Sequence, residues 1–211
     1  IDEMQDYSYL QYVILQRLFD CRMTILGDRA QTLDKEQQDV LKFLPKIFGR
    51  GIRTVVMNKS YRNTWEIASY AGKISGITDI ELLERHGKEV EEKLFASEEE
   101  LLSAIEKNLN VGAEGFETAA VITMTEEEAF DISRLLQNRG IEVSYVDRDS
   151  SAFRKGLTVT TFYLAKGLEF DQVFAVRGRD ENPLSAQAEY ICATRALHEL
   201  YVYQLESVSG C

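Results

Sequence analysis

The chain contains few of the residues that interrupt or cross-link a fold: its 211 residues include only 2 Pro, 3 Cys and 1 Trp. The cysteines are odd in number and lack the paired spacing of a zinc site or a disulfide framework. Two of them, Cys21 and Cys192, lie among apolar residues, so we expect them in the core. No apolar run approaches the roughly 20 residues of a membrane span, and no signal peptide opens the chain. We therefore expect a cytoplasmic protein with no membrane partner.

Basic residues are also in deficit, because 24 Lys and Arg stand against 35 Asp and Glu, giving a formal net charge of -11. Non-specific affinity for nucleic acid comes from clustered Lys and Arg, so this balance argues against a broad phosphate-binding surface. With 45% hydrophobic residues, the chain is not disordered or fibrous. Its length suffices for one sizeable core, or for one and a half domains.

Hydrophobic periodicity predicts helices that alternate with short strands. The expected helices cover residues 8–19, 33–48, 63–74 and 185–197, and the expected strands cover residues 22–26, 53–57, 119–124, 141–146, 157–162, 173–176 and 200–203. Two capping boxes, Ser97-x-x-Glu100 and Thr125-x-x-Glu128, mark further helix starts, and Gly140 is expected to end the second of these helices. Strand, helix and strand with short links predict a parallel sheet with a right-handed crossover.

The most informative stretch is VTTFYLAKGLEFD, residues 159–171. The expected strand at residues 157–162 is followed by Ala165-Lys166-Gly167 and then Glu169. A glycine, a cation and a carboxylate therefore lie together where a strand meets a loop. In open α/β sheets, ligands such as nucleotides bind at the carboxyl ends of the strands. The stretch is therefore a candidate nucleotide site.

Four further strings accompany it: IDEMQD (residues 1–6), LGDRAQ (26–31), NKSYRN (58–63) and YICATRALHELYVY (190–203). Together with residues 159–171 they resemble motifs II, III, IV, V and VI of the UvrD/Rep-type superfamily I helicases and translocases, in the family's order. The resemblance extends over nearly the whole chain. It implies an α/β, RecA-like P-loop NTPase fold with a parallel sheet, and an enzyme that binds ATP and Mg²⁺ and hydrolyses ATP.

The resemblance also implies how the chain is organised. Residues 1–48 correspond to the tail of a first RecA-like domain, with motifs II and III, and residues 49–211 to the second RecA-like domain, with motifs IV, V and VI. The chain begins at Ile1 inside an expected strand, and no GxxxxGK[ST] phosphate loop occurs in it. We therefore expect a carboxyl-terminal piece of a longer protein, inactive as an ATPase by itself.

The first four candidate site residues belong to the motifs nearest the start of the chain. Asp2 and Glu3 resemble the motif II pair, in which the Asp holds Mg²⁺ and the Glu orients or deprotonates the attacking water. Gln5 follows within the same motif and is a candidate for nucleotide binding. Gln31 resembles the family's sensor of the γ-phosphate. Taken singly, an acidic pair is most often part of a solvated loop, and Gln31 is equally well explained as a turn residue. The assignment therefore depends on the complete set of motifs.

The other candidates lie in the second expected domain. Arg62 and Arg195 resemble the two arginines that reach the γ-phosphate, which suits a planar guanidinium that is always charged. Tyr61 resembles the residue that stacks on adenine, although a core aromatic is an equal alternative. Gly167 and Glu169 resemble the pair that approaches the ribose and phosphates.

Two departures from the family concern the target. Residues 32–37 contain no aromatic of the kind that stacks on single-stranded DNA. Tyr163-Leu164 stands where DNA-translocating members have a histidine-serine pair. The strings YLAKG (residues 163–167) and CATRALHEL (192–200) instead resemble the helicase IV/HelD-like branch, whose HelD members use ATP to free RNA polymerase from nucleic acid. The resemblance thus leaves single-stranded DNA or RNA polymerase as partner. A non-enzymatic RecA-like interaction module and a packaging or repair nuclease subunit remain alternatives.

Overall fold

The computed structural model describes residues 1–31, 40–49, 51–57, 59–77, 81–82, 84–150, 154–178 and 184–206. The chain divides into two compact units, Ile1–Asn58 and Lys59–Cys211, called unit 1 and unit 2 below. The expected seam at residues 49–51 lies inside unit 1, and Arg50 falls outside the described residues. The assignment of residues 1–48 and 49–211 to two RecA-like domains stays a prediction.

Unit 1 is built from two helices and two short 3-10 turns. Its elements are η1 (Met4–Asp6), α1 (Tyr9–Leu18), η2 (Arg29–Gln31) and α2 (Val40–Phe48). The sequence offers Ser8 or Asp6 as the N-cap of α1, and the structure has Ser8, in a reciprocal capping box with Gln11. The part of the second expected helix before residue 40 lies outside the described residues. Pro45 lies within α2, whose described part continues to Phe48.

The core of unit 1 forms around Tyr12, which is fully buried against α2. Its ring packs near Phe43, and its hydroxyl donates to the Met4 carbonyl over 2.9 Å. Burial, with a smaller contribution from Tyr7, raises the pKa of Tyr12 to about 12, so the hydroxyl stays protonated and able to donate. The hydrophobic periodicity of residues 8–19 did not identify Tyr12 as the buried residue of α1.

Three expectations for unit 1 are wrong. Residues 22–26 form no strand. Residues 53–57 form none either, and the side chains of Val55, Val56 and Met57 are exposed. A strand needs a neighbouring strand to satisfy its backbone groups, and none of the described strands pairs with this segment. Cys21 is exposed rather than in the core, whereas Cys192 is buried as expected. Cys211 lies outside the described residues.

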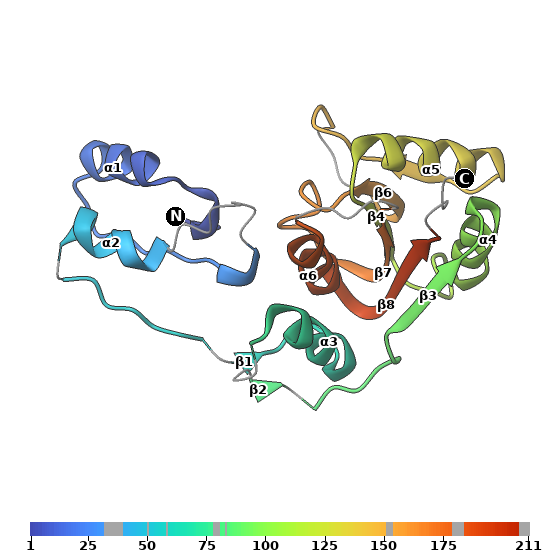
Figure 1. Cartoon of the computed structure of the whole chain (residues 1–211), viewed down its shortest axis with the longest axis horizontal. Coiled ribbons are helices and arrows are strands. Elements are labelled where there is room, and N and C mark those ends of the chain that lie inside the picture. The colour runs from blue at the N-terminus through green and yellow to red at the C-terminus, as the bar shows by residue number, and fades with distance from the viewer. Residues whose placement is uncertain are drawn as a thin grey trace. The chain divides into compact units, whose positions relative to one another are not determined.

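Unit 2 is an α/β unit with a parallel sheet, as the sequence predicts (Figure 1). Its elements are β1 (Lys59–Ser60), α3 (Trp65–Ser75), β2 (Glu81–Leu82), β3 (Glu91–Phe95), α4 (Glu98–Asn108), β4 (Thr118–Thr123), α5 (Glu126–Asn138), β5 (Val143–Tyr145), β6 (Gly156–Thr161), β7 (Phe170–Arg177), α6 (Ser185–Arg195) and β8 (Ala196–Leu205). The six main strands lie in the order β3-β8-β7-β4-β6-β5, and every pair is parallel. Strands β1 and β2 form a separate parallel pair.

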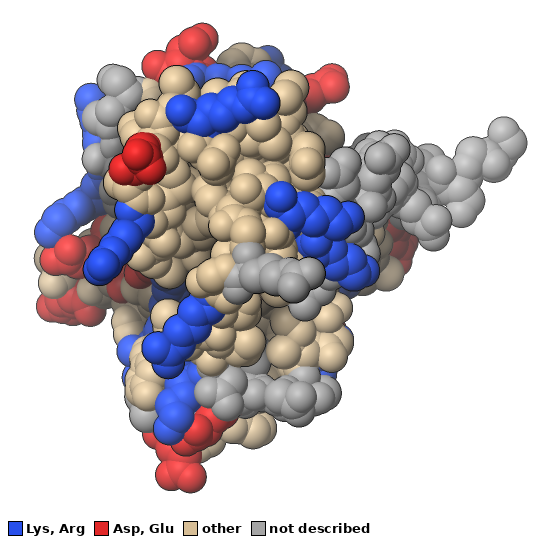
Figure 2. Space-filling model, turned by 90° about the vertical axis from the view of Figure 1, so that its left-hand side faces the viewer, with Lys and Arg blue, Asp and Glu red and all other residues tan. Residues whose placement is uncertain are grey.

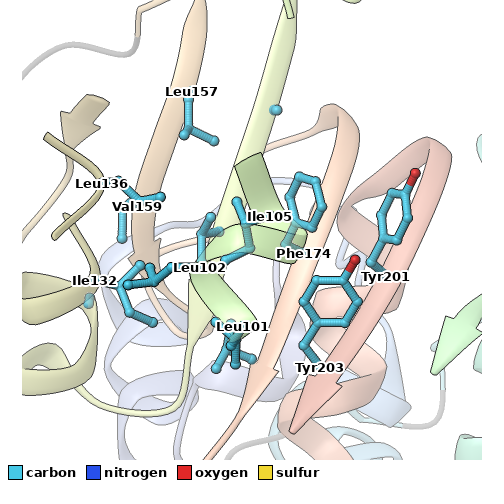
Figure 3. Close-up of a cluster of buried hydrophobic side chains, with 14 residues drawn as sticks. Leu101, Leu102, Ile105, Ile132, Leu136, Leu157, Val159, Phe174, Tyr201 and Tyr203 are labelled. Atoms are coloured by element: carbon cyan, nitrogen blue, oxygen red, sulfur yellow. The ribbon is translucent and has the colours of Figure 1, made fainter. Parts of the chain in front are cut away.

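Helices cover both faces of the six-stranded sheet. On one face, α4 and α5 bury a cluster with the strands. Figure 3 shows Leu102 and Ile105 of α4 beside Phe174 of β7, and Ile132 of α5 near Val159 of β6. On the other face lies α6, with α3 packed against it (Figure 1). Because both faces are covered, central strands such as β4 are apolar almost throughout, as buried parallel strands usually are.

The helix ends follow the expected signals. Thr125 and Glu128 form a complete capping box at α5. At α4, Ser97 accepts from the Glu100 amide, but the Glu100 carboxylate accepts from Ala96 instead of Ser97. Gly140 follows α5 with φ +84°, a conformation that favours glycine.

Among the parts of the chain that the structure describes, no helix combines the length and apolar character that a membrane crossing requires. Figure 2 shows Lys and Arg side chains exposed at several places on one face, among uncharged residues and with some Asp and Glu.

Candidate functional site

The two motifs of unit 1 lie side by side through backbone hydrogen bonds. The amino group of Ile1 donates to Thr24 O over 2.8 Å, and Leu26 N donates to Ile1 O over 2.9 Å. Met4 N in turn donates to Leu26 O over 2.8 Å. Residues 1–4 and 24–26 therefore run side by side in the same direction. The Asp2-Glu3 pair lies next to the turn that begins at Gly27.

Gly27 makes this close approach possible. A Cβ at position 27 would lie 2.4 Å from both Gln5 Oε1 and Met4 Cγ, so no larger residue fits without displacement. Glu3 adopts a left-handed conformation with φ 51°, uncommon for a residue other than glycine. Strain of this kind costs on the order of 1–3 kcal/mol and is concentrated at functional sites. The backbone at Glu3 and Gly27 therefore has a conformation and a close packing that most other residues would not allow.

A chain of side-chain hydrogen bonds links three of the predicted residues in unit 1. Gln5 donates through Nε2 to Glu3 Oε2, and its Oε1 accepts from the Asp28 amide over 3.1 Å. Asp28 Oδ2 accepts from Gln31 Nε2 over 2.9 Å. Glu3, Gln5 and Gln31 are therefore brought together through Asp28, while Asp2 lies at the exposed end of the group. Asp28, which the motif contains, was not assigned a role from the sequence.

The two predicted arginines of unit 2 meet the same short loop, although they are 133 residues apart in sequence. Arg62 Nε lies 2.9 Å from Glu169 Oε1, and both side chains are nearly half exposed. Arg195 Nη1 donates to the Leu168 carbonyl over 3.3 Å, and Nη2 to Thr194 Oγ1 over 3.1 Å. The fold therefore gathers motifs IV, V and VI at residues 168–169.

The loop that receives both arginines begins at the carboxyl end of β6. Its first turn is held by bonds from Ala165 N to Thr161 O over 2.9 Å and from Leu168 N to Ala165 O over 3.0 Å. Gly167 has φ +79°, and no atom lies within 4 Å of the position of a Cβ there. The glycine is therefore favoured by the backbone conformation and not by a lack of space.

The two arginines differ in environment. Arg195 is 2% exposed, and a charge that is buried needs hydrogen-bonding partners to be tolerated. Arg62 lies at the surface, where it can exchange one anionic partner for another. Tyr61, beside it, is 63% exposed, so it is not the core aromatic that the sequence left as an alternative. An exposed ring is available for stacking.

A separate group of charged side chains lies near Tyr163, the residue that departs from the DNA-translocating pattern. The Tyr163 hydroxyl donates to Glu126 Oε1, at the start of α5. Arg148 Nε lies 2.9 Å from the same carboxylate oxygen, and its guanidinium carbon is 5.6 Å from the centre of the Tyr163 ring. The cation at this position is thus already paired within unit 2.

The fold class is α/β with a six-stranded parallel sheet, consistent with a RecA-like fold, as expected. No protein-family model and no curated protein matches the chain. Among solved structures, the chain is similar to the carboxyl-terminal domain of a protein described as a possible DNA helicase from Lactobacillus plantarum WCFS1. The identity is 24% and the TM-score 0.52, covering 71% of this chain and 90% of that chain.

It is also similar to nonstructural protein 10 of an arterivirus, a helicase, with 14% identity and a TM-score of 0.50. That match covers 96% of this chain but only 37% of the viral protein. At these identities the likeness is one of fold. It agrees with the arrangement of elements expected from the motifs.

Proposed function

We propose that the chain is the carboxyl-terminal portion of an ATP-dependent helicase or translocase of the UvrD/Rep type. In such a protein, ATP hydrolysis between two RecA-like domains is coupled to movement on nucleic acid, in the cytoplasm. The observation that carries the proposal is the meeting of Arg62 and Arg195 at residues 168–169, because it unites three motifs that are far apart in sequence. The fold that the chain shares with a domain of a possible DNA helicase and with a viral helicase supports it.

The carboxylates of unit 1 fit a magnesium ion bound together with a nucleotide. Among the described residues, no cluster of three or more His, Cys, Asp or Glu side chains could hold a metal alone. Mg²⁺ is usually bound by one or two carboxylates with phosphates and water, rather than by an all-protein cage. We assign Asp2 as its ligand, and a bound Mg²⁺ would neutralise charge on the phosphates.

The remaining residues position the reacting groups. Glu3, held by Gln5, would orient the attacking water and accept its proton. Gln31, joined to the same hydrogen-bond chain through Asp28, would respond to the γ-phosphate. Arg62 and Arg195 would stabilise the charge that develops on the phosphoryl oxygens, a contribution worth about a thousandfold or more in rate.

Residues near Arg62 would bind the base and the sugar of the nucleotide. Tyr61 would stack on adenine, and Gly167 and Glu169 would approach the ribose and phosphates. Glu169 would then have two alternative partners, the ribose of the nucleotide and Arg62, with which it forms an ion pair in the structure. When Arg62 turns to a phosphate, Glu169 is released for a sugar hydroxyl.

One observation favours RNA polymerase over single-stranded DNA as the partner, in a HelD-like protein. Tyr163 donates to Glu126, and Arg148 forms an ion pair with the same carboxylate. The only cation described in this group is therefore neutralised, which reduces attraction for a DNA phosphate. Release of stalled RNA polymerase by the full-length protein, compared with unwinding of a tailed DNA duplex, separates the two candidates.

The decisive variant is Arg62→Ala in the full-length protein, because Arg62 is exposed and its loss should not disturb folding. We expect ATP turnover to fall by about a thousandfold, with nucleotide affinity largely retained. Arg134→Ala, which removes an exposed arginine paired with Asp131 on α5, is the matched control and should keep full turnover. Turnover in Arg62→Ala equal to that of the control would contradict the proposal. The 211-residue chain alone should not hydrolyse ATP above a Glu3→Gln control.

A further inference from the structure

Arg85 connects the two segments that carry the arginines of unit 2. Its Nη2 donates to the Arg62 carbonyl over 2.5 Å and to the Leu197 carbonyl over 2.9 Å. One guanidinium NH₂ group has two hydrogens, so a single nitrogen can serve both acceptors. The Arg62 segment precedes α3, and Leu197 is two residues beyond Arg195.

A second bond runs beside the first. Asn63 Nδ2 donates to the Ala196 carbonyl over 2.5 Å, and the Asn63 side chain is buried. The pair of residues 62–63 is therefore joined at two points to residues 196–197. These two cross-links fix the backbone of Arg62 relative to that of Arg195.

Arg85 is itself held firmly against the first turn of α3. Its carbonyl accepts from Trp65 N over 2.8 Å, and Gly87 N donates to Glu66 Oε2 over 2.8 Å. His86 Nδ1 lies 2.8 Å from the other Glu66 oxygen. We call residues 85–87 the Arg85 strap, since they tie α3 to the Arg62 segment.

The strap lies so close to α3 that only glycine fits at its end. A Cβ at Gly87 would lie 2.6 Å from Thr64 Cγ2. Within the described residues, no carboxylate forms an ion pair with Arg85, whereas Arg62 is paired with Glu169. The contacts of the Arg85 guanidinium are backbone carbonyls, so its interactions serve geometry rather than charge neutralisation.

We infer that Arg85 is a positioning residue for Arg62: it holds the Arg62 backbone in register with Arg195, so that both guanidinium groups reach one phosphoryl group. This inference rests on the proposed function. A displacement of about 1 Å at a catalytic group can cost on the order of a hundredfold in rate. Loss of an interaction that matters only in the transition state lowers kcat and leaves KM nearly unchanged.

The test uses three variants of the full-length protein. Arg85→Met removes both donors at similar side-chain length, and we expect kcat for ATP to fall by about 10- to 100-fold with KM within a factor of about three. Arg85→Lys retains a donor and should recover part of the loss. Arg139→Met is the matched control, because Arg139 joins α5 to Glu99 and Glu106 of α4, away from the loop at residues 168–169. It should lower the unfolding temperature but not kcat.

A double-mutant cycle separates positioning from general stability. If Arg85 acts through Arg62, then adding Arg85→Met or Arg85→Lys to Arg62→Ala should lower kcat no further. Multiplicative losses, or an unchanged kcat in folded Arg85→Met and Arg85→Lys, would overturn the inference. Should Arg85→Met fail to fold, the cycle with Arg85→Lys decides the question. An inactive wild-type protein, or an Arg62→Ala variant with normal turnover, contradicts instead the proposed function.

Discussion

At the scale of single residues, the candidate site depends on a few side chains that bond to backbone. Asp28 accepts a hydrogen bond from Gln31. Its position in the sequence does not predict this role, because an acidic residue after glycine is equally well explained as a turn residue. Arg85 lies in a charged stretch where periodicity predicts nothing. Both residues were missed from the sequence, since Asp28 also bonds to Gln5 and Arg85 bonds to Arg62, and each of these partners is more than 20 residues away.

Gly27 provides a test at this scale. Gly27→Ala should destabilise unit 1 by about 1–3 kcal/mol, because a Cβ would overlap Gln5 and Met4 in a region already packed. Chemical denaturation of the 211-residue chain measures the loss. Gly51→Ala is the control, as no atom lies within 4 Å of its Cβ position. Equal stabilities for the two variants would show that residues 4–5 can move away from residue 27 at no cost in free energy.

At the scale of elements, the helix caps and the strands of the six-stranded sheet were predictable from the sequence, whereas the pairing of strands was not. Local signals such as Thr125 and Gly140 depend on residues within one turn, so the sequence predicts them directly. Residues 53–57 have the composition of a strand but no partner strand in the described residues. β-structure depends on pairing across the chain, which local pattern does not reveal.

The attachment of the Arg85 strap to α3 predicts an effect of pH. Burial raises the pKa of Glu66, but hydrogen bonds from His86 and the Gly87 amide outweigh it, so the pKa lies below its ordinary value. A lowered pKa in the folded state adds stability that is present above the ordinary value and lost as pH falls through the folded value. Free energies of unfolding measured from pH 7 to pH 3 should therefore decrease.

Glu66→Gln is the variant that isolates this contribution. It should be less stable than wild type at pH 7 by about 1–2 kcal/mol, since hydrogen bonds to a charged group are the stronger ones. The difference between the two proteins should shrink toward pH 3. A constant difference over that range would exclude Glu66 as the source of the pH dependence.

At the scale of the whole molecule, the two units differ in charge. Residues 1–58 contain eight Lys or Arg and eight Asp or Glu, so the net charge of -11 belongs to residues 59–211. Unit 2 nevertheless contains both arginines of the candidate site. A phosphate group would thus meet local cations within an acidic unit, which favours selective over general binding of anions.

Unit 2 should fold independently, because both faces of its sheet are covered by its own helices. Residues 59–206 expressed alone should give a single cooperative unfolding transition by circular dichroism. Leu102→Ala should lower its stability by about 2–5 kcal/mol, as Leu102 is 2% exposed in the main core. A fragment that lacks a cooperative transition would show that unit 2 depends on residues 1–58.

The sequence by itself determined the α/β class, the parallel sheet, most helix boundaries and the set of candidate residues, because these depend on periodicity, caps and motifs within short stretches. Only the tertiary structure decided that Arg62 and Arg195 converge at residues 168–169 and that Asp28 and Arg85 connect the motifs. Hydrogen bonds between distant segments form only when strands and helices take their places in space. Local pattern carries no record of those distances.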